Sequence, residues 1–455
     1  MASAIPSALR EEIEQGTGCV IASERVRGGG GASRQGAELT FRSTGGRERR
    51  CYLAWDERAG DPARLPYFER ETAVLTALSG PLAGAGVKVA PLVASFPSHL
   101  ALLSEFVPGN DRFVQAEDKA ALAHDFVTQL AKLHRVDATN PALAKLGEPN
   151  DPPSRRVCDQ IAEWRRINLA AGADPIYQLA LAWLAENVPE DRGSSVVLHG
   201  DAGPGNFLFE GDRVTALVDW ELTHLGDPME DLAQIWVRSL IQPFIPQRDV
   251  FAAYEAVTET PCDIGRVAYY RLYFQMGFSV PGAATAAAPD AKIGATGTAL
   301  MYGTMHKRVM VRSIAELAGI ALRDPQLPVC RADRMDRYFA TALEDIRNDI
   351  VPAAGNQRAS AKAKELARLV KFWRRRASHG VAFDAAELAE IRELVPDAAD
   401  DLDAAREAFA GAIAAGAVPF ADALQLCHNR MVRETFIMDD AMGALATTWY
   451  DQIAD

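Results

Sequence analysis

The chain has 455 residues, of which 48% are hydrophobic and 24% are charged, and it carries a formal net charge of -13. This composition is typical of a globular protein with a large core and two or three structural units. The negative charge disfavours a nucleic-acid partner, since nucleic-acid binding requires a basic surface. No apolar run approaches the roughly 20 residues of a membrane-spanning helix, and the first residues do not resemble a secretory signal. The sequence therefore predicts a cytoplasmic protein with neither a nucleic-acid nor a membrane partner.

The first region, residues 1–104, predicts a small lobe of strands with one helix. Val20 to Arg27 and Glu38 to Arg42 are strand-like and flank the run Gly28 to Gly31, which is typical of a flexible turn between two strands. A helix is expected where apolar residues recur at helical spacing. The further elements are strands at Arg50 to Trp55, Val87 to Ala94 and Leu100 to Phe106, and the helix at Phe68 to Leu78.

The remaining chain predicts mainly helices. Residues 105–352 have apolar residues at three- and four-residue spacing, interrupted by a short β segment between Ser195 and Trp220. Residues 353–455 are again helical in pattern. Their role is open: they could pack on the preceding region or join two copies of the chain in a homodimer.

The most informative segment runs from His199 to Asp219. It begins with the pattern H-x-D-x-x-x-x-N, formed by His199, Asp201 and Asn206, which has the spacing of the catalytic loop of kinases. Each residue alone has a structural explanation, as a turn or core residue. Their combination at this spacing indicates phosphoryl-transfer chemistry.

A hairpin is predicted directly after this pattern, because two apolar runs flank the turn signal at 210–213. A turn centred between Asp212 and Arg213 places Asn206 directly opposite Asp219. Cross-strand neighbours have Cβ atoms about 4.5–5.5 Å apart. An amide oxygen and a carboxylate would then converge on one point, as oxygen ligation of Mg²⁺ requires. Asp201, five residues earlier, would accept the proton of a substrate hydroxyl.

A helix start follows at Gly226-Asp227-Pro228, with Asp227 as the N-cap and Pro228 at the first helical position. This capping role is sufficient to explain the motif. A catalytic role for Asp227 or Asp231 is the less favoured alternative.

The segments Leu198 to Asp201 with Asn206, Val218 to Glu221, and Gly226 to Pro228 resemble the aminoglycoside phosphotransferase/choline kinase family. The resemblance covers roughly residues 20–340. It implies an α+β, bilobal protein-kinase-like fold with a small β-rich N-lobe and a mainly helical C-lobe. Residues 353–455 would be an additional helical region.

The same resemblance implies roles for the residues of the informative segment. Asp201 would be the catalytic base, and His199 would act with it by supporting the catalytic loop. Asn206 and Asp219 would be the Mg²⁺ ligands.

The resemblance also implies a nucleotide site for ATP, with GTP not excluded. The glycine-rich turn would cover the phosphates, where backbone N–H groups can approach closely. Glu71 matches the helix glutamate that normally pairs with a strand Lys or Arg, and backbone groups of Glu105 and Val107 would meet the adenine. The turn residues expected at the nucleotide are Gly30, Gly31 and Ser33.

One departure from the family pattern concerns the third strand, which should carry a basic residue for the nucleotide phosphates. Trp55, or less favourably Ala54, occupies that position. Arg50 and Arg58 flank it, but side chains on a strand alternate between faces, so neither is an obvious substitute. A Trp could stack on the adenine but cannot neutralise phosphate.

The expected function is ATP-dependent, Mg²⁺-dependent phosphorylation of a hydroxyl on a small molecule, such as an aminoglycoside, a choline-like alcohol or a hydroxyacyl-CoA. The alternative is a pseudokinase or nucleotide-binding regulatory protein, which the missing strand cation favours. A protein kinase is disfavoured, because no D-F-G or A-P-E pattern follows Asp219.

Overall fold

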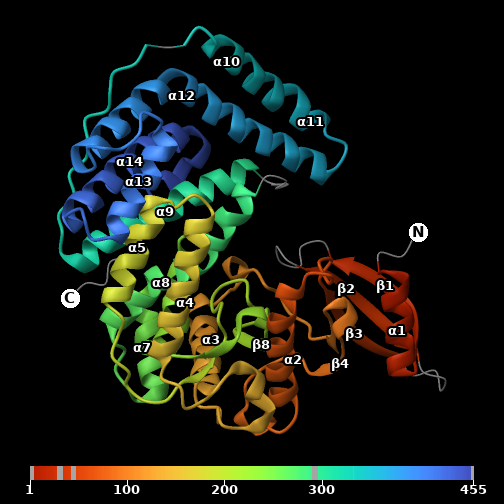
Figure 1. Cartoon of the computed structure of the whole chain (residues 1–455). Helices are drawn as coiled ribbons and strands as arrows, with labels where there is room; N and C mark the ends of the chain where they lie inside the picture. Colours follow the sequence, from red (N-terminus) through yellow and green to blue (C-terminus); the bar gives the residue numbers. More distant parts are fainter. Residues whose placement is uncertain (1–4, 28–33, 43–47, 289–295, 332, 452–455) are drawn as a thin grey trace. The chain divides into compact units, whose positions relative to one another are not determined.

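The computed structural model describes residues 5–27, 34–42, 48–288, 296–331 and 333–451 (Figure 1). Contacts divide the chain into two compact units, here unit 1 (residues 1–156, 191–267 and 451–455) and unit 2 (residues 157–190 and 268–450). This division cuts across the second region expected from the sequence, since residues 105–352 contribute to both units.

Unit 1 contains a five-stranded antiparallel sheet with the strand order β1-β2-β3-β5-β4. Cys51, Leu53 and Trp55 alternate along β3 and are buried in one core with Leu9 and Ile13 of helix α1. The elements are α1 (Ser7–Thr17), β1 (Val20–Arg27), β2 (Gln35–Arg42), β3 (Glu48–Trp55), β4 (Leu92–Phe96) and β5 (Ala101–Glu105).

Two predictions for this lobe differ from the structure. The strand expected at Val87 to Ala94 begins only at Leu92, and Val89 forms an isolated bridge to Leu217 instead. Helix α1 was not predicted, because only two of its residues, Leu9 and Ile13, are buried and the others are mostly polar.

Helix α2 (Leu65–Ser79) follows the short 3-10 helix η1 (Pro62–Arg64) and confirms the helix expected at Phe68 to Leu78. Its buried face includes Val74, Leu75 and Leu78, together with one charged residue, Glu71. A buried carboxylate on an apolar helix face requires a partner, because an unpaired charge is costly to bury.

The rest of unit 1 is mainly helical and contains two small antiparallel strand pairs. The strand pair β6–β9 precedes helix α6, and the hairpin β7–β8 packs against α3. The elements are α3 (Lys119–Leu133), β6 (Val196–Leu198), β7 (Phe207–Glu210), β8 (Arg213–Leu217), η6 (Trp220–Leu222), β9 (His224–Gly226), α6 (Pro228–Ser239) and α7 (Gln247–Thr258).

Unit 2 consists of helices, with the long helix α12 packed against α9, α10, α13 and α14. In the described part of the chain, no helix is both long and apolar enough to cross a membrane. The elements are α4 (Pro153–Ala170), α5 (Pro175–Glu186), α8 (Ile264–Ala287), α9 (Thr296–Ala318), α10 (Asp336–Asp345), α11 (Val351–Ala353), α12 (Gln357–Leu394), α13 (Leu402–Ala414) and α14 (Phe420–Met442).

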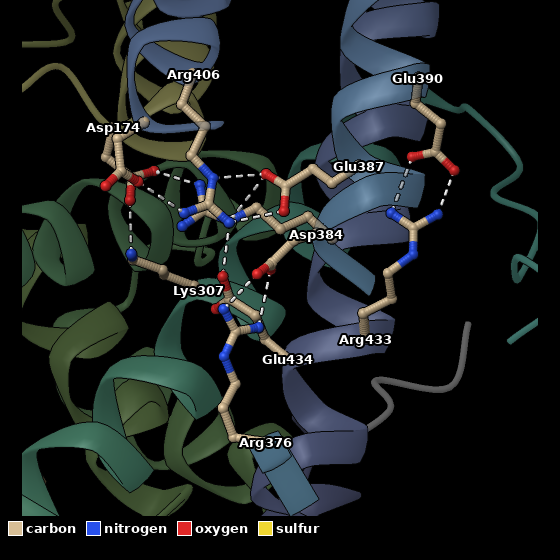
Figure 2. A network of polar contacts seen from close by, with 11 residues as sticks. Asp174, Lys307, Arg376, Asp384, Glu387, Glu390, Arg406, Arg433 and Glu434 are labelled. Atoms are coloured by element: carbon tan, nitrogen blue, oxygen red, sulfur yellow. Dashed lines mark hydrogen bonds and ion pairs between the residues drawn. The ribbon is translucent and has the colours of Figure 1, made fainter. Parts of the chain in front are cut away.

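A buried network of ion pairs joins the helices of unit 2 (Figure 2). Asp174 caps α5 by accepting from the Ile176 N–H at 2.9 Å, and it also accepts from Lys307 Nζ of α9 at 2.6 Å. Burial acts to lower the pKa of Lys307, but the interactions with Asp174, Tyr177 and Glu434 together outweigh it and the net shift is upward. Arg406 of α13 binds Glu387 of α12 through two nitrogens, each at 2.7 Å. These pairs fix the register between neighbouring helices.

Replacing Lys307 by Met should destabilise the protein by about 3 kcal/mol, because the largely buried Asp174 loses its nearest cation and is left with the more distant Arg430, at 3.5 Å. Urea unfolding followed by circular dichroism measures this. The matched control is Lys371→Met, which removes a half-buried lysine whose Nζ donates to the Asp440 carbonyl. Equal stability of the two variants would show that the buried pair contributes nothing specific.

Candidate active site

The loop between β6 and β7 presents Asp201, whose side chain is 18% exposed. The path of this loop depends on glycine at two positions. Gly200 has φ 85°, and a Cβ there would lie 2.0 Å from the Leu222 carbonyl oxygen. Gly203 has φ 148°, and a Cβ there would lie 2.8 Å from Arg238 Cδ. The loop is thus closely packed on both sides.

One face of helix α6 holds this loop through three polar side chains. The Asp231 carboxylate accepts from the His199 N–H at 2.9 Å and from the Gly200 N–H at 3.0 Å. Gln234 accepts from the Ala202 N–H at 2.8 Å. Positions 231, 234 and 238 recur at three- and four-residue spacing, so they share one side of the helix. We call Asp231, Gln234 and Arg238 the loop-holding face.

Asp231 itself is completely buried and also contacts His134 Nε2 at 3.0 Å. Burial acts to raise the pKa of this carboxyl, but the hydrogen bond and the charge of His134 outweigh it, and the net shift is downward. The catalytic role considered for Asp231 is therefore not supported. It is a buried anchor for the loop.

Arg238 contacts the proposed base directly. Its Nη1 lies 2.7 Å from each carboxylate oxygen of Asp201, and its Nη2 donates to the Pro204 carbonyl at 2.8 Å. Nη2 also lies 3.3 Å from Asn206 Oδ1. The guanidinium therefore fixes the orientation of Asp201 through charge-assisted hydrogen bonds.

His199 is completely buried, so it cannot touch a substrate. Its Nε2 bonds to the Val218 carbonyl at 3.0 Å, and its ring lies 4.7 Å from that of Trp220. Burial lowers the pKa of the imidazole. The supporting role expected for His199 fits this environment, whereas a direct catalytic one does not.

The predicted hairpin forms, but its predicted register is wrong by one residue. The turn residues are Gly211 and Asp212, and a bulge lies between Leu208 and Phe209. The Val218 N–H consequently bonds to the Asn206 carbonyl at 3.0 Å, so Val218 and not Asp219 is the partner of Asn206. The turn is centred one residue earlier than the one assumed, which shifts the pairing by two positions, and the bulge reverses one of them.

Asp219 lies directly after that pair in a left-handed conformation, with φ 66°. Burial, together with the negative charges of Glu221, Asp201 and Glu71, raises the pKa of Asp219 to about 7. The charge of Asp201 thus reaches Asp219, as expected of two groups in one site. A carboxyl in so negative an environment favours a bound cation.

The donor set fits Mg²⁺ when substrate phosphates complete it. Magnesium sites commonly use one or two carboxylates plus phosphate oxygens and water. Asp219 would supply a carboxylate and Asn206 an amide oxygen, while Asn206 Nδ2 donates to Asp201 Oδ2 at 2.7 Å. Within the described residues no group of three His, Cys, Asp or Glu side chains is arranged to hold a metal alone.

Glu71 has a basic partner, but this partner does not come from β3. Arg34 Nη2 lies 2.5 Å from Glu71 Oε2, and both side chains are largely buried. Burial raises the pKa of Glu71, partly offset by Arg34. Arg34 immediately precedes β2, so the expected ion pair is made by a residue of the segment before β2 and not by one on β3.

The two arginines that flank the β3 position without a basic residue form hydrogen bonds with other side chains. Arg50 bonds to Glu38 on β2, and Arg58 donates to Asp56 through its Nε at 3.0 Å. Trp55 is buried in the core with α1, so the stacking on adenine considered for it is not supported. Ala54 lies on the opposite face of the strand.

Comparison with known proteins decides the family. The model of the phosphotransferase enzyme family matches residues 34–263, about half of the chain. This chain is a member of that family. The matched range includes the Arg34–Glu71 pair and the whole segment from His199 to Asp219.

Two curated relatives of this phosphotransferase are acyl-CoA dehydrogenase family members. Member 11 of Gallus gallus is 34% identical over 111 residues, which are 24% of this chain and 14% of the relative. Member 10 of Mus musculus is 26% identical over 205 residues, or 42% of this chain and 19% of the relative. The chain thus matches less than a fifth of the length of either relative.

A solved structure supports the fold of the phosphotransferase. A Ralstonia eutropha JMP134 protein, described provisionally as an aminoglycoside phosphotransferase, aligns with a TM-score of 0.53 and 21% identity. The alignment covers 69% of this chain and 97% of the other. The predicted fold is confirmed: a kinase-like α+β fold with a small β-rich lobe, a mainly helical part and additional C-terminal helices.

The remaining predicted residues of the nucleotide site are less defined. The Glu105 N–H already bonds to the Pro91 carbonyl at 2.8 Å, so only its carbonyl could meet an adenine. Val107 follows in the segment after β5 and is partly exposed. Gly30, Gly31 and Ser33 lie outside the described residues.

Sequence reasoning missed the loop-holding face of α6. The helix was interpreted through its apolar residues, such as Leu232, Ile235 and Trp236. The available signal was the polar set Asp231, Gln234 and Arg238, which recurs at helical spacing within an otherwise apolar helix.

Proposed function

We propose that this phosphotransferase transfers the γ-phosphoryl group of ATP to a hydroxyl of a small molecule with the help of Mg²⁺. The observation that carries the proposal is the placement of Asp201. Its carboxylate reaches the surface of a loop held by α6, bonds to Asn206 Nδ2 and Arg238, and interacts electrostatically with Asp219. A base beside two oxygen ligands is the arrangement that phosphoryl transfer requires.

The chemistry assigned to Asp201 is proton acceptance from the acceptor hydroxyl. As that proton moves to a carboxylate oxygen of Asp201, the hydroxyl oxygen bonds to the γ-phosphorus. The bond from that phosphorus to the β–γ bridging oxygen breaks, and ADP leaves. Arg238 keeps Asp201 oriented for this step. Asn206 and Asp219 would hold Mg²⁺, which when bound neutralises charge on the phosphate oxygens.

For the acceptor we favour a hydroxyacyl-CoA as the first candidate. The support is the similarity to relatives named as acyl-CoA dehydrogenase family members, which concerns only a small part of those proteins. Aminoglycosides and choline-like alcohols are the other classes to compare.

The experiment is a transfer assay with radiolabelled ATP and Mg²⁺ against these three acceptor classes, with products identified by mass spectrometry. We expect label on one acceptor and its complete loss after EDTA treatment, with recovery on adding excess Mg²⁺. If the protein binds Mg·ATP but labels no acceptor and does not hydrolyse ATP, the kinase function is wrong. That outcome would support the alternative, a pseudokinase or nucleotide-binding regulatory protein.

A further inference from the structure

β3 lacks the expected basic residue, but Arg34, just before the neighbouring strand β2, carries a positive charge. We propose that Arg34 binds the phosphates of the nucleotide and that Glu71 is the residue that positions it. This inference rests on the proposed use of ATP and assigns the phosphate-binding cation within that site.

The strand register places Arg34 beside the vacant position. Gln35 pairs with Trp55 and Gly36 pairs with Ala54 across β2 and β3. Arg34 therefore emerges next to the last residues of β3, where a strand lysine would be expected. Ala54, the small residue at this end of β3, cannot supply a charge.

Glu71 holds the Arg34 side chain in place. The Nη2 to Oε2 distance of 2.5 Å joins a guanidinium that is 12% exposed to a carboxylate that is 5% exposed. In protein kinases the equivalent strand-to-helix ion pair must form before catalysis. Here the helix partner is unchanged and the cation comes from the segment that precedes β2.

Arg34 also interacts electrostatically with residues of the proposed metal site. Besides Glu71, the negative charges of Asp219 and Glu221 act on its guanidinium. Arg64 Nη2 donates to Glu221 Oε2 at 3.0 Å, so Glu221 has a cationic partner besides Arg34. Arg34 thus pairs with the helix glutamate and also interacts electrostatically with Asp219, the proposed Mg²⁺ ligand, as a group that binds the phosphates of Mg·ATP would.

Arginine suits this position because its planar guanidinium presents several N–H donors in fixed directions. One edge can remain on Glu71 while the other binds phosphate oxygens. Since the site is largely buried, such charge-assisted hydrogen bonds are strong.

The test measures binding of Mg·ATP, Mg·ADP and adenosine to wild type and to Arg34→Met, by calorimetry for the nucleotides and saturation-transfer NMR for adenosine. We expect Arg34→Met to weaken Mg·ATP and Mg·ADP by about 10- to 100-fold and to leave adenosine binding unchanged. The matched control is Arg42→Met, an exposed β2 arginine paired only at the surface with Glu48.

A second variant separates phosphate binding from a purely structural ion pair. Arg34→Met leaves Glu71 buried without its partner, so the double variant Arg34→Met/Glu71→Leu removes both charges. If the pair only fastens α2 to the sheet, the double variant should regain wild-type affinity for Mg·ATP. If the double variant still binds Mg·ATP weakly and binds adenosine normally, the result supports direct binding of the phosphates by Arg34.

The two proposals fail in different ways. Wild-type affinity of Arg34→Met for Mg·ATP overturns the role of Arg34 but leaves the proposed function standing. Absence of Mg·ATP binding by the wild-type protein overturns the proposed function, and the assignment of Arg34 falls with it.

Discussion

Replacing Asp201 by Asn should reduce phosphoryl transfer about 1,000-fold while Mg·ATP affinity changes little, since a positioned base contributes about 10²- to 10⁴-fold. Asparagine keeps the shape of the side chain and an oxygen that can accept from Arg238. It cannot take the proton of the acceptor hydroxyl. Single-turnover transfer to the acceptor found in the screen, combined with calorimetry of Mg·ATP, separates the two effects.

The control for this variant is Asp212→Asn, which makes the same chemical change in the exposed turn of the β7–β8 hairpin. It should transfer at the wild-type rate. Transfer by Asp201→Asn at that same rate would exclude Asp201 as the base.

A leucine at Asp231 should remove both stability and activity. Two buried backbone N–H groups, of His199 and Gly200, and the His134 ring would lose their acceptor together. With about 1–3 kcal/mol for each unsatisfied group, the free energy of unfolding should fall by about 4 kcal/mol. Transfer should be lost as well, because the loop that carries Asp201 is released from α6.

Chemical denaturation of three variants checks this expectation. Asp231→Asn retains one acceptor oxygen and should lie between wild type and Asp231→Leu. Asp249→Leu, an exposed carboxylate in the first turn of α7, should be close to wild type. If Asp231→Leu unfolds at the same denaturant concentration as Asp249→Leu, the carboxylate does not anchor the loop.

Local patterns predicted the elements that have a clear sequence signal of their own. β1 coincides with its predicted range, which the glycine run in the sequence delimits, and α2 contains its predicted range because its apolar residues recur at helical spacing. The register of the β7–β8 hairpin was wrong, since it depends on which residues occupy the turn. A bulge and a glycine at position 211 shift the pairing, and apolar alternation alone does not reveal them.

The candidate site was predictable where its residues are close in sequence. His199, Asp201 and Asn206 lie within eight positions, so their spacing carries the signal. Arg34 and Glu71 come from different elements, and only the fold brings the two charges together. A basic residue was sought along β3, whereas the structure supplies it from the segment before β2.

The loop-holding face of α6 restricts the motion of the loop that carries Asp201. The loop from His199 to Asn206 is held by one side of a helix that is itself mostly buried. Its amide groups at His199, Gly200 and Ala202 can open to solvent only when they separate from that helix. Asp201 therefore belongs to the same cooperative unit as α6 and shares its rigidity, although it lies in a loop.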